Sequence, residues 1–289
     1  MILVTGATGN IGQELVRQMG EAGVPVRALV RDASRAGDLK EMGAEIAVGD
    51  LSKPETIGPA LEGVDKAFLL TATDPAQVEV QGNFIDAAKR ANLDHVVKLS
   101  VVGAAPDAPA KLMRWHAQTE ADLAASGLPY TNLRPHVFYQ YYLYLAPMVI
   151  GMGGFTASLQ SGVKLASIDI RDIAAAALVV LKDPSGHNGQ TYFLTGPEAF
   201  SNNDLAEKIG KMIGKPVTYT WSPGDVSRAA MIDMGFAEWM ADVVTEMDEA
   251  YSTGNYSYTT TAVKDITGNE PRSVDQFLDE FSFVFAGGE

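Results

Sequence analysis

The chain opens with a short apolar run, three evenly spaced glycines and an amphipathic segment, and no other feature constrains its fold as strongly. Residues 2–4 predict a buried strand, and residues 11–19 carry apolar side chains at helical spacing. Gly6, Gly9 and Gly12 lie between them. Glycine lets the backbone turn sharply and approach a phosphate, and a helix N-terminus offers unpaired N–H groups. This order predicts a site for a dinucleotide pyrophosphate, with a purely structural turn as the alternative.

Strands and helices alternate along the first half of the chain. We expect strands at residues 2–4, 25–30, 44–48, 65–70, 95–99 and 130–134. After the first helix, further helices are expected at residues 34–42, 54–61, 77–91 and 113–126. Such alternation is typical of βαβ units. The sequence therefore predicts an α/β fold with a Rossmann-type doubly wound parallel sheet and right-handed crossovers.

The regular alternation ends after residue 134, and this change suggests how the chain is divided. We expect residues 1–133 to form the dinucleotide-binding domain, with residues 163–195 returning to it through a helix and a further strand of the main sheet. Residues 134–162 and 196–289 are expected to form a smaller C-terminal α/β lobe over the edge of the sheet where ligands bind. Beyond residue 134, Asp172 and Ser201 are the expected N-caps of two helices.

Composition excludes several kinds of partner and site. The net charge of −14 repels nucleic-acid phosphates and anionic membranes, so we expect neither as a partner. The chain has no cysteine, and its four histidines show no metal-ligand spacing, so no metal site is expected. No apolar stretch reaches the roughly 18 residues of a membrane helix, and residues 141–154 are expected to be buried or to line a pocket. Because no basic region precedes the first apolar run, we expect a cytoplasmic protein without a signal peptide.

The carboxyl ends of the predicted strands are where a bound cofactor would lie. The candidate residues at these ends are Asp50, Leu51, Leu70, Thr71, Ala72, Thr73, Ser100 and Pro135. Asp50 could accept a hydrogen bond from the adenine amino group, or it could cap a turn. The sequence leaves both roles open.

Cofactor preference depends on the end of the second strand. An acid there would bind the ribose 2′-hydroxyl of NAD, whereas an arginine would pair with the 2′-phosphate of NADP. Asp32 lies 20 residues beyond Gly12, where such an acid is expected, but Arg31 precedes it. Arg35 and Lys40 add a local basic cluster to an acidic chain, so we favour NADP.

The helix expected at residues 113–126 follows the fifth strand. Classical short-chain dehydrogenases place a tyrosine acid and a lysine four residues apart on this helix, and the aligned residues here are Leu112 and His116. His116 could bind a ribose hydroxyl or donate a proton near neutral pH, although a purely structural histidine is the alternative. Glu120 lies one turn further on and is expected to orient its neighbours.

Six aromatic or imidazole rings fall within residues 135–144. Some are expected in the core, but four of them are tyrosines, whose hydroxyl groups need partners when buried. A flat pocket lined by such rings suits a planar conjugated acceptor. Tyr141 or Tyr139 could supply the proton that a reduced oxygen or nitrogen needs.

Several motifs together resemble a known family. They are Val-Thr-Gly-Ala-Thr-Gly-Asn-Ile-Gly at residues 4–12, Val30-Arg31, Gly49-Asp50, the His116 and Glu120 pair, and residues 126–135, 170–174 and 191–197. In these the chain resembles the NmrA-like atypical short-chain dehydrogenases. Within that family it is most similar to NADPH-dependent quinone oxidoreductases and triphenylmethane dye reductases, which also have histidine at the position of His116.

The resemblance implies a Rossmann domain with a small C-terminal lobe and a bound NADP. It places the cofactor on Gly6, Thr8, Gly9, Asn10, Ile11 and Gly12, with Arg31 on its phosphate. It also implies that residues 71–73 and His116 approach the nicotinamide. Those reductases have asparagine after the arginine of the sixth strand, where this chain has Pro135, so substrate contacts are not carried over.

Two hypotheses of function follow. The first is direct hydride transfer from NADPH to a quinone or to an azo or triarylmethane dye, without flavin or metal. The expected partner is a small aromatic or quinone-like compound, and a homo-oligomer is compatible with the sequence. The second is an NADP(H)-binding redox sensor or regulator without turnover, since the family also contains such members. The missing tyrosine acid is compatible with the second, whereas the aromatic stretch favours the first.

Overall fold

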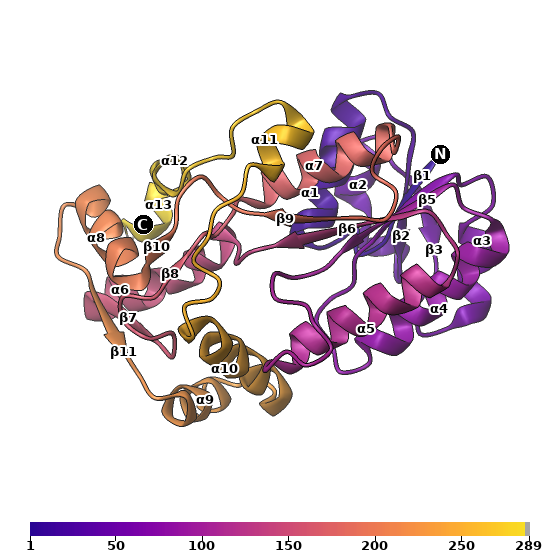
Figure 1. The fold of residues 1–289 in the computed structure, drawn as a ribbon. Coiled ribbons are helices and arrows are strands. Elements are labelled where there is room, and N and C mark those ends of the chain that lie inside the picture. The colour runs from indigo at the N-terminus through magenta and orange to yellow at the C-terminus, as the bar shows by residue number, and fades with distance from the viewer. Residues whose placement is uncertain (287–289) are drawn as a thin grey trace.

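The computed structural model describes residues 1–286, except for the side chain of Arg35. Its centre is a parallel sheet in the order β3-β2-β1-β4-β5-β6-β9 (Figure 1). The strands are β1 Ile2–Val4, β2 Val26–Val30, β3 Glu45–Val48, β4 Lys66–Leu69, β5 His95–Leu99, β6 Tyr130–Pro135 and β9 Gln190–Leu194. This topology confirms the predicted doubly wound fold, including β9 as a strand of the main sheet.

Helices cover both faces of the sheet. One layer contains α1 Asn10–Glu21, α2 Gly37–Glu41 and α7 Ile170–Lys182, and the other contains α3 Ile57–Ala60, α4 Gln77–Ala91 and α5 Lys111–Ala125. Successive strand residues alternate between the layers: Ile2 and Val4 pack in the first, and Leu3 packs in the second. Both faces of each central strand are therefore buried, which explains their continuous apolar sequences.

A smaller lobe lies at one end of the sheet (Figure 1). The elements of this lobe are the 3-10 helix η3 Tyr139–Leu145, α6 Ala146–Met152, β7 Gly154–Ala157, β8 Lys164–Leu165, β10 Phe200–Ser201, α8 Asn202–Ile213, β11 Thr218–Trp221, α9 Gly224–Asp233, α10 Glu238–Ser252, α12 Val274–Glu280 and α13 Ser282–Phe285. The main core of the lobe surrounds Tyr139, whose ring contacts the rings of Phe200 and Phe277. Within the described residues, no helix combines the length and apolar character needed to cross a bilayer.

The two expected N-caps have different outcomes. Ser201 caps α8 in a capping box with Asp204, as predicted. The prediction for Asp172 was wrong, because α7 begins earlier and Asp169 caps it. The Asp172 carboxylate instead accepts hydrogen bonds from the backbone and side chain of Arg272, and so joins α7 to the C-terminal part of the chain.

The C-terminal part of the chain also returns to the sheet domain. Helix α11 Ala262–Thr267, which the sequence analysis did not anticipate, packs against α7 and β9. Its Val263 is 2% exposed and belongs to the core between α1, α7 and the sheet. The predicted division of the chain stays a prediction: one part contains residues 1–133 and 163–195, and the other contains residues 134–162 and 196–289. Helix α11 belongs to the second part but packs on the first.

Residues 141–154 are less buried than the sequence predicts. Tyr142 and Val149 point into the lobe, but Tyr141, Tyr144 and Met152 are exposed. The segment therefore has one inner face and one open face, which a run of apolar residues does not reveal.

Candidate active site

The glycine loop between β1 and α1 is shaped to leave room beside its backbone. Gly6 has a φ of +59°, and a Cβ there would lie 2.8 Å from the carbonyl oxygen of Leu70. A Cβ at Gly12 would overlap the carbonyl oxygen of Gly6, so only glycine lets α1 pack this closely on the loop. Gly9 is different: it is exposed, and its nearest neighbour would be 3.4 Å away. Gly9 thus keeps the outer surface of the loop open.

The N-terminus of α1 is free to bind an anion. Its N-cap Gly9 makes no side-chain cap bond, and the first turn contains no acidic residue. Thr8, Gly9 and Asn10 are all exposed. Because the first N–H groups of a helix lack intrahelical partners and lie at its positive end, this loop fits a pyrophosphate.

Arg31 and two aspartates lie where the cofactor ribose is expected. Arg31 is exposed directly after β2. The Asp32 side chain accepts a hydrogen bond from the Ser34 N–H at 2.9 Å and caps a short 3-10 helix. Asp50 accepts from the N–H and hydroxyl of Ser52, and these bonds, with the charge of Arg31, hold the pKa of its carboxyl below the usual value. Both aspartates therefore have a turn-stabilising role, and the Arg35 side chain, expected in this cluster, lies outside the described residues.

Side chains of α4 hold the loops after β3 and β4. Gln81 donates to the Thr71 hydroxyl at 2.8 Å, and Asn83 donates to the Leu51 carbonyl at 2.9 Å. At the end of β4, the Thr5 hydroxyl donates to the Leu70 carbonyl and accepts from the Leu70 N–H. Leu70, Thr71 and Thr73 are partly buried and Ala72 is exposed. Hydrogen bonds from α4 and from Thr5 thus hold in place the strand-end loops that are predicted to face the cofactor.

His116 lies between two polar side chains. Lys98 Nζ is 3.1 Å from its Nδ1, and Gln77 Nε2 is 3.3 Å from its Nε2. Burial lowers the pKa of His116 well below its usual value, and the nearby charges of Lys98 and Arg134 lower it further. The imidazole is therefore neutral at pH 7 and offers one N–H, not an imidazolium.

A second polar cluster links β5, β6 and α5. Glu120 accepts two hydrogen bonds from the Arg134 guanidinium, at 2.9 Å from Nε and 2.5 Å from Nη2, and a short one from the Ser100 hydroxyl. The guanidinium also lies over the Phe193 ring, 5.5 Å from its centre. The prediction that Glu120 orients its neighbours describes this arrangement, but Ser100, predicted to bind the cofactor, directs its hydroxyl to Glu120. Ser100 is buried, so its role toward a cofactor stays a prediction.

Lys98 is the site residue that the sequence analysis missed. Its side chain is fully buried in β5, with Nζ also donating to the Leu99 carbonyl at 3.2 Å. A signal was present in the sequence, since Lys98 interrupts the apolar residues Val96, Val97 and Leu99 of a central strand. Charged residues are almost never fully buried unless they have a partner.

The aromatic stretch divides into core and surface residues. Tyr139 is fully buried and donates to the Arg272 carbonyl, and Tyr142 donates to the Ser167 hydroxyl, so both are structural. Tyr141 stacks on Phe138 with ring centres 5.3 Å apart, and half of its surface is exposed. Burial of the hydroxyl raises the pKa of Tyr141. Pro135 is buried at the end of β6, where it pairs with Leu194.

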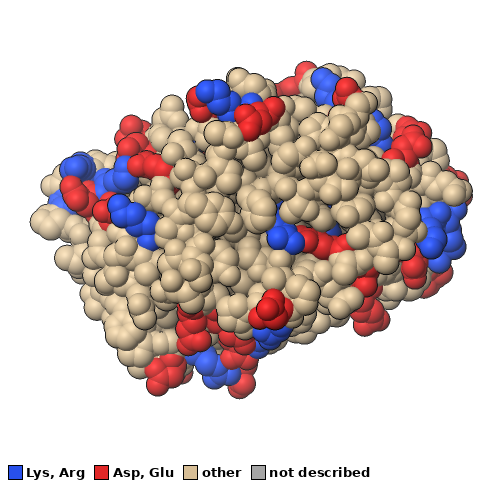
Figure 2. All heavy atoms as spheres, in the orientation of Figure 1, with Lys and Arg blue, Asp and Glu red and all other residues tan. Residues whose placement is uncertain are grey.

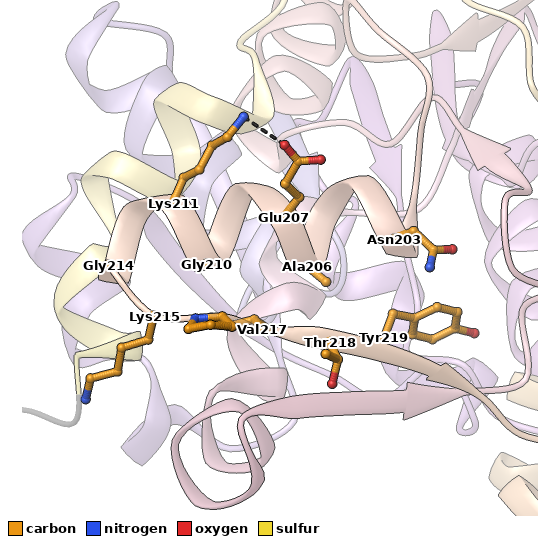
Figure 3. Close-up of a pocket in the computed structure, with 11 residues that line it drawn as sticks. Asn203, Ala206, Glu207, Gly210, Lys211, Gly214, Lys215, Val217, Thr218 and Tyr219 are labelled. Carbon is orange, nitrogen blue, oxygen red and sulfur yellow. Dashed lines mark ion pairs between the residues drawn. The ribbon is translucent and has the colours of Figure 1, made fainter.

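Charged side chains lie mainly around the rim of the face in Figure 2, and its middle is uncharged except for adjoining basic and acidic side chains. A groove of about 560 Å³ lies in the smaller lobe, between α8 and β11 and away from the glycine loop (Figure 3). Its Lys211 and Glu207 pair with each other at 2.9 Å, so these two charges are already matched.

No group of histidine, aspartate and glutamate side chains within residues 1–286 could hold a metal ion.

Comparison with known proteins places these features in context. An NAD(P)H azoreductase from Xenophilus azovorans is 38% identical over 285 residues, which is 99% of each chain. The structure of an Escherichia coli NADPH-dependent quinone oxidoreductase complexed with NADPH superimposes with a TM-score of 0.89 at 30% identity, covering 98% of this chain and 100% of the other. Citrobacter triphenylmethane reductase complexed with NADP(H) gives 0.87 at 25% identity, covering 97% and 99%.

These similarities confirm the resemblance inferred from the sequence motifs. The NmrA-like family matches residues 1–278, which include the glycine loop, the buried polar clusters and most of the smaller lobe. The chain therefore belongs to the NmrA-like family.

Proposed function

We propose that this protein is an NADPH-dependent oxidoreductase that transfers hydride directly to a planar conjugated acceptor such as a quinone or an azo or triarylmethane dye. The open glycine loop at the uncapped N-terminus of α1 is the observation that carries the proposal. Relatives named azoreductase and quinone oxidoreductase, and neighbours solved with NADPH, support the same class of reaction. The proposed reaction needs no flavin or metal. The proposal includes a cytoplasmic location and a small aromatic or quinone-like substrate as partner, and it is compatible with a homo-oligomer.

NADPH is favoured over NADH by the side chains near the ribose. Arg31 is exposed and positively charged, as a 2′-phosphate requires. Asp32 and Asp50, the two acids that would bind an unphosphorylated ribose or the adenine, already accept hydrogen bonds within their own turns. Residues Gly6 and Thr8 to Gly12 would hold the pyrophosphate, and the bound cofactor would supply the hydride.

The protein would then bind, orient and protonate the acceptor. The exposed ring of Tyr141, backed by Phe138, offers a flat apolar surface for an aromatic compound. His116 and Tyr141 are the candidate proton donors. Both are uncharged at neutral pH, so each would act through a neutral N–H or O–H that hydrogen-bonds the negative charge the acceptor gains with the hydride.

The second candidate is a redox sensor that binds NADP(H) without turnover. One observation favours it: both ring nitrogens of His116 already have protein partners, Lys98 and Gln77. A histidine held in this way could serve only to stabilise the site.

The two functions are separated by measuring nucleotide binding and turnover on the same preparation. We expect NADPH oxidation, followed by its absorbance, to accelerate with at least one member of a panel of quinones and azo dyes. Tight NADPH binding without turnover on any member would favour the sensor. Weak binding of both NADPH and NADH would contradict both candidates.

A further inference from the structure

Lys98 occupies a position that a lysine rarely tolerates. It is fully buried, and the charged or titratable groups facing it are His116 and Glu120 from α5 and Arg134 from β6. Glu120 and Arg134 pair with each other, so the ammonium is left with the Leu99 carbonyl and His116 Nδ1 as its partners. A buried ammonium persists only where its donors are used.

The contacts of His116 determine which ring nitrogen carries the proton. An ammonium has only donors, so Nδ1 must be the acceptor of the 3.1 Å bond from Lys98. A neutral imidazole has one donor and one acceptor nitrogen, and Nε2 must therefore carry the proton. Gln77 then has to present its amide oxygen to Nε2, so its amide group must be turned over relative to the placement in which Gln77 Nε2 lies 3.3 Å from His116 Nε2.

We propose that Lys98 is a positioning residue that holds His116 in its Nε2–H tautomer and directs this N–H toward Gln77 at the site edge. Without Lys98, the Nδ1–H form becomes accessible, because the donor that requires Nδ1 to accept is then gone. The effect of Lys98 on catalysis rests on the proposed reductase function. The assignment of the His116 tautomer does not depend on that function.

Side-chain ¹⁵N NMR of the imidazoles tests the tautomer directly, since protonated and unprotonated ring nitrogens resonate far apart. We expect wild-type protein at pH 6 to show His116 as Nε2–H, assigned through the loss of its signals in His116→Gln. In Lys98→Met the Nδ1–H form should become the major or an equal population. A wild-type Nδ1–H tautomer, or an unchanged tautomer in Lys98→Met, would overturn the proposal.

Lys66→Met is the matched control. Lys66 also donates to two backbone carbonyls, those of Leu181 and Lys182, but it lies at the opposite end of the strands. Its loss should leave the His116 tautomer unchanged. Should Lys98→Met fail to fold, the wild-type spectrum at pH 6 still tests the proposal. An Nε2–H tautomer there supports the assignment, and an Nδ1–H tautomer overturns it.

Kinetics connect the tautomer to the reaction. If the wild type reduces an acceptor, Lys98→Met should lower kcat by about ten-fold and change the KM for NADPH by less than about two-fold, because it alters the orientation of a proton donor and not the cofactor loop. Unchanged kcat with an altered tautomer would remove His116 from proton transfer. Absence of turnover in the wild type would contradict the reductase function and leave the NMR result standing.

Discussion

Arg31 is exposed at the end of β2, close enough to the β3 loop to lower the pKa of Asp50. Charge-assisted hydrogen bonds contribute about 1.5–3 kcal/mol each. Arg31→Ala should therefore weaken NADPH binding by roughly 10- to 100-fold and NADH binding by less than about three-fold. Titration calorimetry with both nucleotides measures this difference. Lys89→Ala, at an exposed basic residue near the end of α4, is the control, and equal losses for the two nucleotides in Arg31→Ala would contradict a phosphate contact.

His116 is best tested with a residue that preserves the partner of Lys98. In His116→Gln the amide oxygen can still accept from the lysine, so no buried ammonium is left unpaired. We expect kcat to fall by roughly 10- to 100-fold while NADPH affinity and thermal stability stay close to the wild type. Steady-state kinetics and a thermal melt provide the measurements. Wild-type kcat in this variant would show that His116 has only a structural role.

At the scale of single elements, the glycine loop combines two functions that separate substitutions can distinguish. Gly12→Ala would place a Cβ on the Gly6 carbonyl oxygen, so we expect a loss of about 1–3 kcal/mol in the free energy of unfolding. At Gly9 the nearest atom is 3.4 Å away, so Gly9→Ala should fold normally. Its methyl group nevertheless projects toward the expected pyrophosphate and should weaken NADPH binding.

Denaturant unfolding and nucleotide titration on the same two variants test this distinction. The expected pattern is low stability for Gly12→Ala, and near-normal stability with weak binding for Gly9→Ala. Normal NADPH affinity in Gly9→Ala would show that the cofactor does not approach this part of the loop.

Elements with a strong local pattern were predictable from the sequence, and contacts between distant elements were not. Helix α4 and strand β5 have the predicted boundaries because residues 77–91 show helical periodicity and residues 95–99 form a nearly apolar run. Helix α11 is too short to show a periodic pattern, and it depends on packing against α7.

The same limit applies within the candidate site. The glycine loop could be identified because strand, turn and helix are adjacent in sequence. The contact of Lys98 with His116 spans 18 residues, and the bond between Glu120 and Arg134 joins a helix to a strand. Such pairs depend on how β5, β6 and α5 are placed, which no local pattern encodes. The roles of His116 and Tyr141 in catalysis stay predictions.

At the scale of the whole molecule, buried histidines make stability depend on pH. Burial lowers the pKa of His95 and of His136 to about 4 each. The unfolded chain takes up these protons near pH 6.5, so their stabilising effect is present above that pH and is lost as the pH falls toward 4. For each of the two histidines, we expect the free energy of unfolding to fall by on the order of 1 kcal/mol for every unit by which the pH is lowered in this range.

Chemical denaturation at a series of pH values from 7 to 4.5 measures this dependence. His95→Gln removes one titrating group while keeping a hydrogen-bonding side chain next to Thr131. Its stability should vary less steeply with pH than that of the wild type. Parallel curves for the two proteins would show that His95 is not responsible for the pH dependence.

The return of α11 to the sheet domain has a mechanical consequence. The chain passes from the smaller lobe to α7 and β9, back to α8, and again to α11 before it returns to the smaller lobe with α12 and α13. Separation of the lobes would thus strain several connections at once, and the ion pairs of Arg171 with Glu280 and of Lys111 with Glu246 oppose it further. A single protease cut in the exposed loop at residues 253–255 should give two bands on a denaturing gel but one particle in gel filtration. Several chain crossings and two ion pairs thus tie the smaller lobe to the sheet domain, and we expect the two to move together.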